Sequence, residues 1–258
     1  MFYTAVRTKE VLEMSAQVQT NFKRYEKKFF LTDEQYRLFT EKVNSYVRPD
    51  KYSKYTVCNI YYDTDDYRLI RASIEKPVYK EKLRVRSYGV PDKGDRVFVE
   101  LKKKFDGVVY KRRITTSSAL VEPFLKGIRS VSENGQIVRE IEYFQRFYNT
   151  KPKVFIAYDR QSFQGIENSD LRITFDTNMR FRLENLNLLD GDYGERITDS
   201  NDILMEIKVP GTCPLWLCQI LSELKLTSTS FSKYGTCYRE HILKNNKNLF
   251  NKEMLLSA

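Results

Sequence analysis

The spacing of apolar residues alternates along the chain between a period of two, typical of strands, and a period of about 3.6, typical of helices. The period-two runs predict eight β-strands, over residues 22–30, 55–63, 78–88, 96–105, 107–115, 153–163, 170–183 and 202–209. The helical runs predict four helices, over residues 32–46, 134–149, 214–226 and 231–246. Thr32 and Gln35 have the spacing of a capping box at the start of the first helix. A tight-turn composition from Phe105 to Val108 predicts that the strands on either side pair antiparallel.

The organisation of the chain favours one elaborate domain, because 258 residues contain no repeat, linker or break in composition. We expect an N-terminal extension over residues 1–20, a single domain over 21–250 and a C-terminal tail over 251–258. The segment 185–201 is rich in Gly, Asp and Asn, and we expect it to form a long mobile loop.

The residue types exclude several kinds of chemistry. The four cysteines form no CxxC pair and the chain has one histidine, His241, so no zinc-type cluster can be built. We expect His241 on a helix surface, without a catalytic role, and a P-loop motif is absent from the sequence. No apolar stretch is long enough to span a membrane and the first residues do not resemble a signal peptide. We therefore expect a soluble, cytoplasmic protein in a reducing compartment.

Charge changes the picture of the strands. The chain has a formal net charge of +10, with 41% hydrophobic residues to supply a core. Side chains two residues apart share a face of a strand, and this rule places the strand charges together on one face. The residues assigned to that face are Arg24, Glu26, Lys28, Lys80, Lys82, Arg84, Arg86, Glu100, Lys102, Lys104, Lys111, Arg113, Arg160, Arg172, Asp176, Arg180, Arg182, Glu206 and Lys208. Lys233 is expected at the mouth of the same site.

Each strand alone fits a half-buried sheet with one face in water. Across eight strands, however, the charged face is dominated by Lys and Arg, and like charges on neighbouring strands repel unless an anion compensates them. Apolar outer faces covered by helices would turn the sheet into a closed barrel with a cationic lumen, which could hold a chain of phosphates. The carboxylates Glu26, Glu100 and Glu206 would then serve a phosphate-bound Mg²⁺ or Mn²⁺, or each could instead pair with a lysine.

Seven short motifs follow one another in order from about Asn21 to Asn245. They are Arg24–Lys28, Tyr79–Gly89, Val99–Lys102 followed by Lys111 and Arg113, Tyr158–Arg160, Leu171–Ile173, Met205–Lys208 and Phe231–Tyr234. In these motifs the chain resembles the triphosphate tunnel metalloenzymes, or CYTH-like superfamily, and within them the VTC-type polyphosphate polymerase domain in a stand-alone prokaryotic-type form. The resemblance implies an α+β fold with an antiparallel eight-stranded tunnel, a divalent metal, and transfer of the γ-phosphate of ATP to a growing polyphosphate chain.

The first motif departs from the hydrolytic branch of the family, which typically opens with Glu-x-Glu-x-Lys. Arg24 stands at the first Glu position, where it removes a metal ligand and adds a phosphate clamp. This favours a polymerase over a triphosphatase. The SPX-type regulatory domain and the membrane helices of eukaryotic relatives have no room in 258 residues, so we expect a membrane protein partner to supply any attachment.

The resemblance and the chemistry of phosphoryl transfer assign roles to the charged residues. The expected catalytic residues are Lys28, Arg84, Arg86, Lys102, Arg160, Arg172 and Lys208. The expected phosphate- and nucleotide-binding residues are Arg24, Lys82, Lys111, Arg113 and Lys233. Glu206 is the principal candidate metal ligand, and Glu26 and Glu100 are second choices.

Three alternatives to the polymerase remain open. One is an inorganic or nucleoside triphosphatase of the tunnel family, and another is a non-catalytic module that binds polyphosphate or inositol phosphates. The third is a nucleic-acid-binding protein, which the basic composition alone would favour. That class expects aromatic side chains interleaved with the cations, whereas the parity rule places Tyr and Phe mostly opposite the charges. We therefore expect ATP and polyphosphate as ligands, and no nucleic acid.

Overall fold

The computed structural model describes residues 24–244, except for residues 107, 130, 132–134 and 199–201. The strands are β1 (Arg24–Leu31), β2 (Val47–Asp63), β3 (Tyr79–Tyr88), β4 (Arg96–Phe105), β5 (Val108–Ser117), β6 (Lys151–Gly165), β7 (Arg172–Arg182), β8 (Glu195–Arg196) and β9 (Ile203–Pro210). The α-helices are α2 (Asp33–Val43), α3 (Arg68–Ile74), α4 (Ser118–Leu125), α5 (Gln136–Tyr148), α6 (Leu215–Glu223) and α7 (Lys233–Cys237). A 3₁₀ turn, η1 (Leu188–Asp190), and a π-helical turn, η2 (Tyr238–Ile242), complete them. The expected extension over 1–20 and tail over 251–258 lie outside the described residues.

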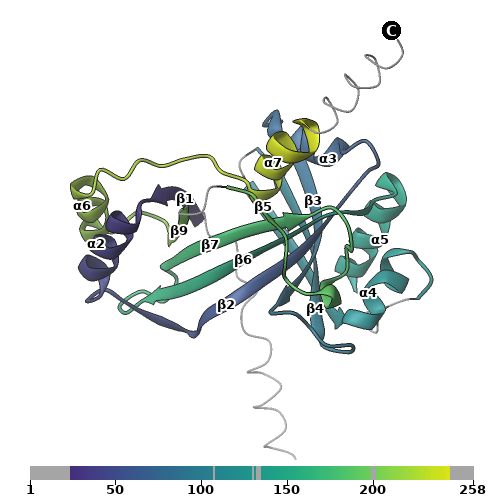
Figure 1. Ribbon diagram of the computed structural model, residues 1–258, viewed down its shortest axis with the longest axis horizontal. Coiled ribbons are helices and arrows are strands. Elements are labelled where there is room, and N and C mark those ends of the chain that lie inside the picture. Colours follow the sequence, from purple (N-terminus) through teal and green to yellow (C-terminus); the bar gives the residue numbers. More distant parts are fainter. Residues whose placement is uncertain (1–23, 107, 130, 132–134, 199–201, 245–258) are drawn as a thin grey trace, which may run out of the picture.

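The strands form one antiparallel sheet in the order β1-β9-β7-β6-β2-β3-β4-β5, with β8 paired to β7. All eight predicted strands are confirmed, and the turn after Phe105 does join the antiparallel pair β4 and β5. The closed eight-stranded barrel is not what the structure shows. Within the described ranges the sheet has nine strands and is open between β1 and β5. The fold is therefore α+β with a curled, open sheet (Figure 1).

Two pairs of helices cover the apolar outer side of the sheet, and three of these four helices, α2, α5 and α6, were expected. Helices α2 and α6 lie beside β1 and β9 at one end of the molecule, and α4 and α5 lie beside β3 to β5 at the other (Figure 1). The capping box of α2 is present, because Thr32 and Gln35 exchange hydrogen bonds of 3.1 Å. The short helices α3 and α4 were not expected, and α4 contains Pro123 in its interior.

Helices α3 and α7 pack on the opposite side of the sheet from α4 and α5. Tyr234 of α7 stacks on Tyr61 of β2 with ring centroids 4.7 Å apart, and its hydroxyl donates to the buried Asp63. Asp63 also accepts from the backbone amides of Leu69 and Ile70, so one carboxylate joins β2, α3 and α7. The helices are thus not confined to the outside of the curled sheet. His241 follows α7 in the helical turn η2, where it is half-buried with its ring centroid 4.4 Å from that of Phe181.

A one-residue register shift between β6 and β7 moves two arginines away from the charged face. Ala157 pairs with Arg180, but Asp159 pairs with Thr177, and the bulge reverses the parity of β7. Arg180 and Arg182 therefore lie on the outer side with Ala157 rather than with the other strand cations, which corrects the assignment made from parity alone.

The segment 185–198 is held in place by these two arginines instead of being a free loop. Arg182 donates to the backbone carbonyls of Asn185, Asn187, Gly191 and Tyr193 over 2.8–3.0 Å. Its guanidinium also lies 3.6 Å from the ring centroid of Phe155. Arg182 is consequently the centre of the segment's hydrogen bonding.

We predict that Arg182→Ala lowers the free energy of unfolding by about 2 kcal/mol or more, because it leaves several carbonyls without a donor. Urea denaturation monitored by circular dichroism measures the loss. Arg139→Ala, which removes an exposed arginine from α5, is the matched control and should change stability by less than about 0.5 kcal/mol. Equal stability of the two variants would contradict the role of Arg182.

Candidate polyanion-binding site

One face of the sheet, here called the charged face, carries Arg84, Glu100 and Arg160 together with most of the predicted cations. Its strongest feature is a lysine row, formed by Lys82, Lys102 and Lys111. Lys82 pairs with Lys102 across β3 and β4, and Lys102 pairs with Lys111 across β4 and β5. Three ammonium groups on directly opposed positions repel one another, because no carboxylate separates them in the row. The row is therefore a place where an anion would relieve strain.

The curl of the sheet brings this row close to the strands at the far end of the strand order. Burial is the main reason why the pKa of Lys111 is lowered, and the next cause is the positive charge of Lys208 on β9. The negative charges of Glu26 on β1 and Glu206 on β9 act in the opposite direction and raise the pKa of both Lys102 and Lys111. Lys102 is reached by solvent, yet surrounding protein lowers its pKa. The charges of β1 and β9 thus reach the lysines of β4 and β5, even though β1 and β5 are not paired.

Lys82 is the most perturbed lysine of the row. Burial, together with the like charges of Lys102, Lys80 and Lys28, lowers the pKa of Lys82 to about 8. Its Nζ lies 3.5 Å from the hydroxyl of Ser232, just before α7. A lysine with this pKa changes its charge within the physiological pH range, so its affinity for an anion depends on pH.

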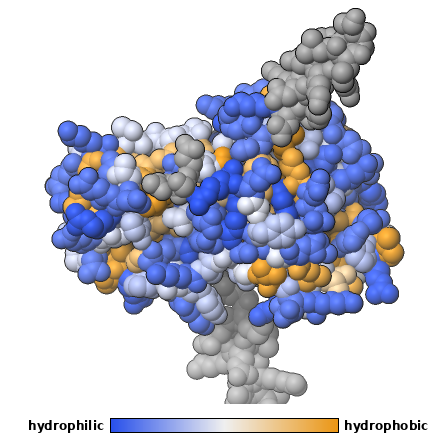
Figure 2. All heavy atoms as spheres, in the orientation of Figure 1, coloured by the Kyte–Doolittle hydropathy of each residue, from blue (hydrophilic) through white to orange (hydrophobic). Residues whose placement is uncertain are grey.

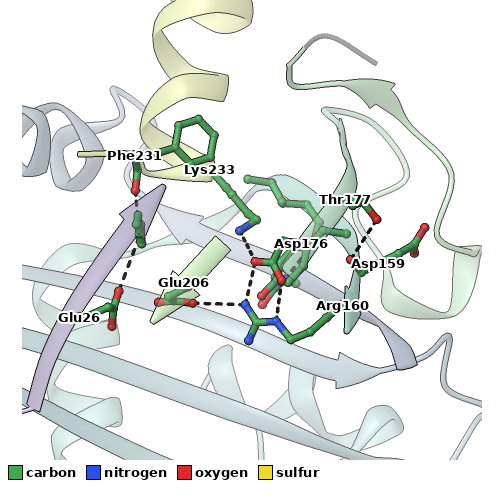
Figure 3. A network of polar contacts seen from close by, with 12 residues as sticks. Glu26, Asp159, Arg160, Asp176, Thr177, Glu206, Phe231 and Lys233 are labelled. Atoms are coloured by element: carbon green, nitrogen blue, oxygen red, sulfur yellow. Dashed lines mark hydrogen bonds and ion pairs between the residues drawn. The ribbon is translucent and has the colours of Figure 1, made fainter. Parts of the chain in front are cut away.

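A second group of charges surrounds Asp176 at the centre of the face (Figure 3). Arg160 of β6 donates to both carboxylate oxygens of Asp176 over 2.6 and 2.8 Å, and its Nη2 lies 3.4 Å from Glu206. Lys233 reaches the same carboxylate from α7 over 2.6 Å. Both cations also lie over the ring of Tyr158, at 5.1 and 4.2 Å from its centroid. Asp176 is fully buried, so its ion pairs hold Arg160 and Lys233 in fixed positions.

Glu26 and Glu206 form the best candidate for a cation site. Glu26 is opposite Lys208 and Glu206 is opposite Lys28 in the paired strands β1 and β9, so the two carboxylates lie diagonally across this pair on the same face. Burial opposes ionisation of Glu206, but Lys208, the contact with Glu26 and Arg160 outweigh it and hold the pKa well below the ordinary value. Two adjacent carboxylates beside a phosphate-binding surface suit Mg²⁺ or Mn²⁺, which take one or two carboxylates and fill their remaining positions with phosphate oxygens and water. The described residues contain no group of three or more protein ligands, so substrate oxygens would have to complete the shell.

Glu100 occupies a different position from the one expected for a metal ligand. It accepts from Arg84 over 2.7 Å and from Arg113 over 2.8 Å, and lies 3.9 Å from Arg86. Burial raises its pKa, but these three arginines overcome that effect and bring the pKa to about 2. The structure therefore shows Glu100 in ion pairs, with arginines in place of the lysine that the sequence suggested. Glu100 orients the arginines of β3 and β5.

The remaining predicted residues are distributed around these groups. Lys28 donates to the carbonyl of Phe231 over 2.9 Å and lies 3.6 Å from Glu26. Lys208 lies 3.4 Å from Glu206. Arg172 lies directly opposite Lys208 across β7 and β9, but it is exposed and its guanidinium lies 3.7 Å from Asp50. The side chain of Arg24 lies outside the described residues.

Aromatic and amide side chains that the sequence did not assign also belong to the charged face. The hydroxyls of Tyr61 and Tyr158 accept from Arg84 and Arg86, respectively, each over 3.3 Å. Asn59 accepts from Arg86 over 2.9 Å. The expectation that aromatic residues lie opposite the charges is thus wrong for these tyrosines. The parity rule would have found them if it had been applied to Tyr and Asn as well as to the charges.

One cavity lies elsewhere, on the outer side of the sheet. It has a volume of about 1100 Å³, is lined by α4, α5 and residues 186–189, and includes none of the predicted site residues. The face of the molecule drawn in Figure 2 is mostly hydrophilic, and its apolar patches remain separate. Among the helices that the structure describes, none has both the length and the hydrophobicity needed to cross a membrane.

Comparison with known proteins agrees with the fold and the charges. The family model of the VTC domain matches residues 23–241, so the chain belongs to the VTC domain family. Subunit 4 of the vacuolar transporter chaperone complex of Schizosaccharomyces pombe is 26% identical over 145 residues. That alignment covers 48% of this chain and 20% of the relative, so the chain spans about a fifth of the relative's length.

Two solved structures are similar to this chain at low sequence identity. The PH1819 protein from Pyrococcus horikoshii is 15% identical, with a TM-score of 0.42, over 86% of this chain and 99% of that chain. A candidate adenylate cyclase from Vibrio parahaemolyticus is 12% identical, also with a TM-score of 0.42, over 84% and 98% of the two chains.

We predict that the affinity for inorganic triphosphate falls as the pH rises through the pKa of Lys82, about 8, because the ammonium group is charged below that pH and neutral above it. Lys82→Arg keeps the charge throughout this range. By pH 9 the wild-type protein should have lost up to about tenfold in affinity relative to the variant. Calorimetric titrations at pH 7, 8 and 9 test this, and parallel pH profiles of the two proteins would contradict it.

Proposed function

We propose that this VTC domain is a polyphosphate polymerase, which transfers the γ-phosphate of ATP to a growing inorganic polyphosphate chain. The observation that carries the proposal is the lysine row facing Glu26 and Glu206 across the charged face. A row of uncompensated cations suits a ligand with several phosphates in line, and the adjacent carboxylates suit a phosphate-bound metal. Membership of the VTC family and the relative from a vacuolar transporter chaperone complex support the same function.

The proposed reaction requires positioning and charge neutralisation rather than acid–base chemistry. A terminal oxygen of the acceptor chain attacks the γ-phosphorus, the bond to the bridging β–γ oxygen breaks, and ADP leaves with both bonding electrons. The attacking oxygen is already ionised near neutral pH, so no general base is needed. This is consistent with a charged face on which the described acidic groups are engaged with cations.

Each group of side chains has a proposed part in the transfer. Arg84 and Arg86 would hold the phosphates of the donor, oriented by Glu100 and Asn59. Arg160 and Lys233 would hold phosphates near Glu206, and the lysine row would hold the acceptor chain. A divalent metal bound by Glu206 and Glu26 would neutralise charge on the phosphate oxygens. The exposed Arg172 would contact the chain outside the centre.

Purified protein incubated with ATP and Mn²⁺ should produce ADP and a ladder of phosphate polymers on a gel. Orthophosphate without polymer would contradict the polymerase and indicate a triphosphatase. Binding of polyphosphate without ADP release would indicate a non-catalytic binding module. The relative belongs to a complex, which supports a separate search for a partner protein that captures the product.

Glu206→Gln removes the charge of the principal metal ligand while keeping its size. We predict that it lowers the metal-dependent rate on the order of 100-fold and raises the Mn²⁺ concentration needed for half-maximal rate. Circular dichroism should confirm that the variant is folded, and Glu167→Gln, at an exposed position, is the matched control. An unchanged Mn²⁺ requirement would indicate that other carboxylates bind the metal.

A further inference from the structure

Three aromatic side chains form a continuous row on the charged face, at the end of β3 remote from α7. This aromatic row consists of Tyr55, Tyr88 and Phe98. The rings of Tyr55 and Tyr88 are 5.6 Å apart and nearly perpendicular, at 77°. Those of Tyr88 and Phe98 are also 5.6 Å apart, at 68°. Tyr88 is 48% exposed, so one ring of the row is open to a ligand.

The aromatic row is joined directly to the cations of the charged face. The guanidinium of Arg113 lies 4.5 Å from the ring centroid of Phe98, and its Nη2 donates to the hydroxyl of Tyr88 over 3.4 Å. Arg113 also binds Glu100, which binds Arg84. The exposed aromatic ring is thus connected to Arg84 through Arg113 and Glu100. None of the roles proposed above uses this ring.

The spacing fits a ligand with a phosphate chain at one end and a flat ring at the other. Tyr88 and Arg84 lie four residues apart on the same face of β3, which corresponds to roughly 13 Å along the strand. This is comparable with the length of a ribose and a triphosphate chain. Aromatic side chains stack on nucleobases because both have an apolar π-face, and this stacking tolerates any base.

We propose that Tyr88 stacks on the base of the nucleoside triphosphate donor, with Tyr55 and Phe98 supporting its ring from either side. This inference rests on the proposed function, because it names how the donor is oriented at the same site. The aromatic rings contact the face of the base and form no hydrogen bonds with its edge, so adenine and guanine nucleotides bind with similar affinity. Inorganic polyphosphate has no base and does not use the aromatic row. The row therefore distinguishes the donor from the acceptor.

Calorimetry with two ligands tests the inference on the full chain. Adenylyl imidodiphosphate, which cannot transfer its terminal phosphate, probes the donor, and inorganic triphosphate probes the cations alone. We expect Tyr88→Ala to weaken binding of the nucleotide roughly tenfold and to leave the affinity for triphosphate unchanged. Tyr88→Trp and Tyr88→Phe should retain nucleotide binding, because both keep a stacking ring. The guanine analogue should match the adenine compound within a few-fold.

Tyr79→Ala is the matched control, since Tyr79 is a comparably exposed tyrosine of β3 on the opposite face of the strand. Equal loss of nucleotide affinity in the Tyr79 and Tyr88 variants would overturn the inference. It would also be overturned if Tyr88→Ala weakened both ligands alike, because Tyr88 would then act through Arg113. Failure of triphosphate to bind the wild-type protein would reject the proposed function and this inference together. Triphosphate binding with no effect of Tyr88→Ala would reject the inference alone.

Discussion

Repulsion between like charges is the constraint on which this structure depends. The sheet holds its cations on one face, and each directly opposed pair costs some tenths of a kcal/mol. Two carboxylates offset part of that cost, because Glu100 is shared by three arginines and the buried Asp176 is shared by Arg160 and Lys233. Helices that bury the apolar outer side supply the remaining stability. The lysine row has no such shared carboxylate among the described residues, and this makes it the natural position for a bound polyanion.

The fold was predictable wherever hydrophobic periodicity alone determines an element. All eight main strands and the helices around α2, α5, α6 and α7 follow from it, because each places one apolar side against the core. Helix α3 has seven residues and α4 contains Pro123, so neither has a periodic signal strong enough to read. The expected closed barrel is not observed, because the pattern within one strand carries no information on whether the two edge strands of the sheet pair with each other.

The sequence was sufficient to predict which charged residues lie at the site, but not which of them contact one another. Parity found Arg84, Lys102 and Arg160, since alternation along a strand is a local property. It failed for Arg180 and Arg182, because a bulge depends on the partner strand. The neighbourhood of Glu26 and Glu206 likewise arises from the pairing of β1 with β9. Tyr61 and Tyr158 were overlooked because parity was applied to the charged residues alone, although it places these tyrosines on the same face.

The pairing of the first described strand with the last has a consequence for how the protein is made. Lys28 of β1 bonds to Phe231, 203 residues further along the chain, and β1 has β9 as its partner in the sheet. Such distant contacts form slowly, because a loop of nearly the whole chain must close before they bring any gain. Throughout synthesis on the ribosome β1 thus waits without a partner strand, while β3, β4 and β5 already carry their lysines and arginines. Until β9 and α7 emerge, these cations lack Glu206 and the helix that later lie beside them, in solvent that also contains ribosomal RNA.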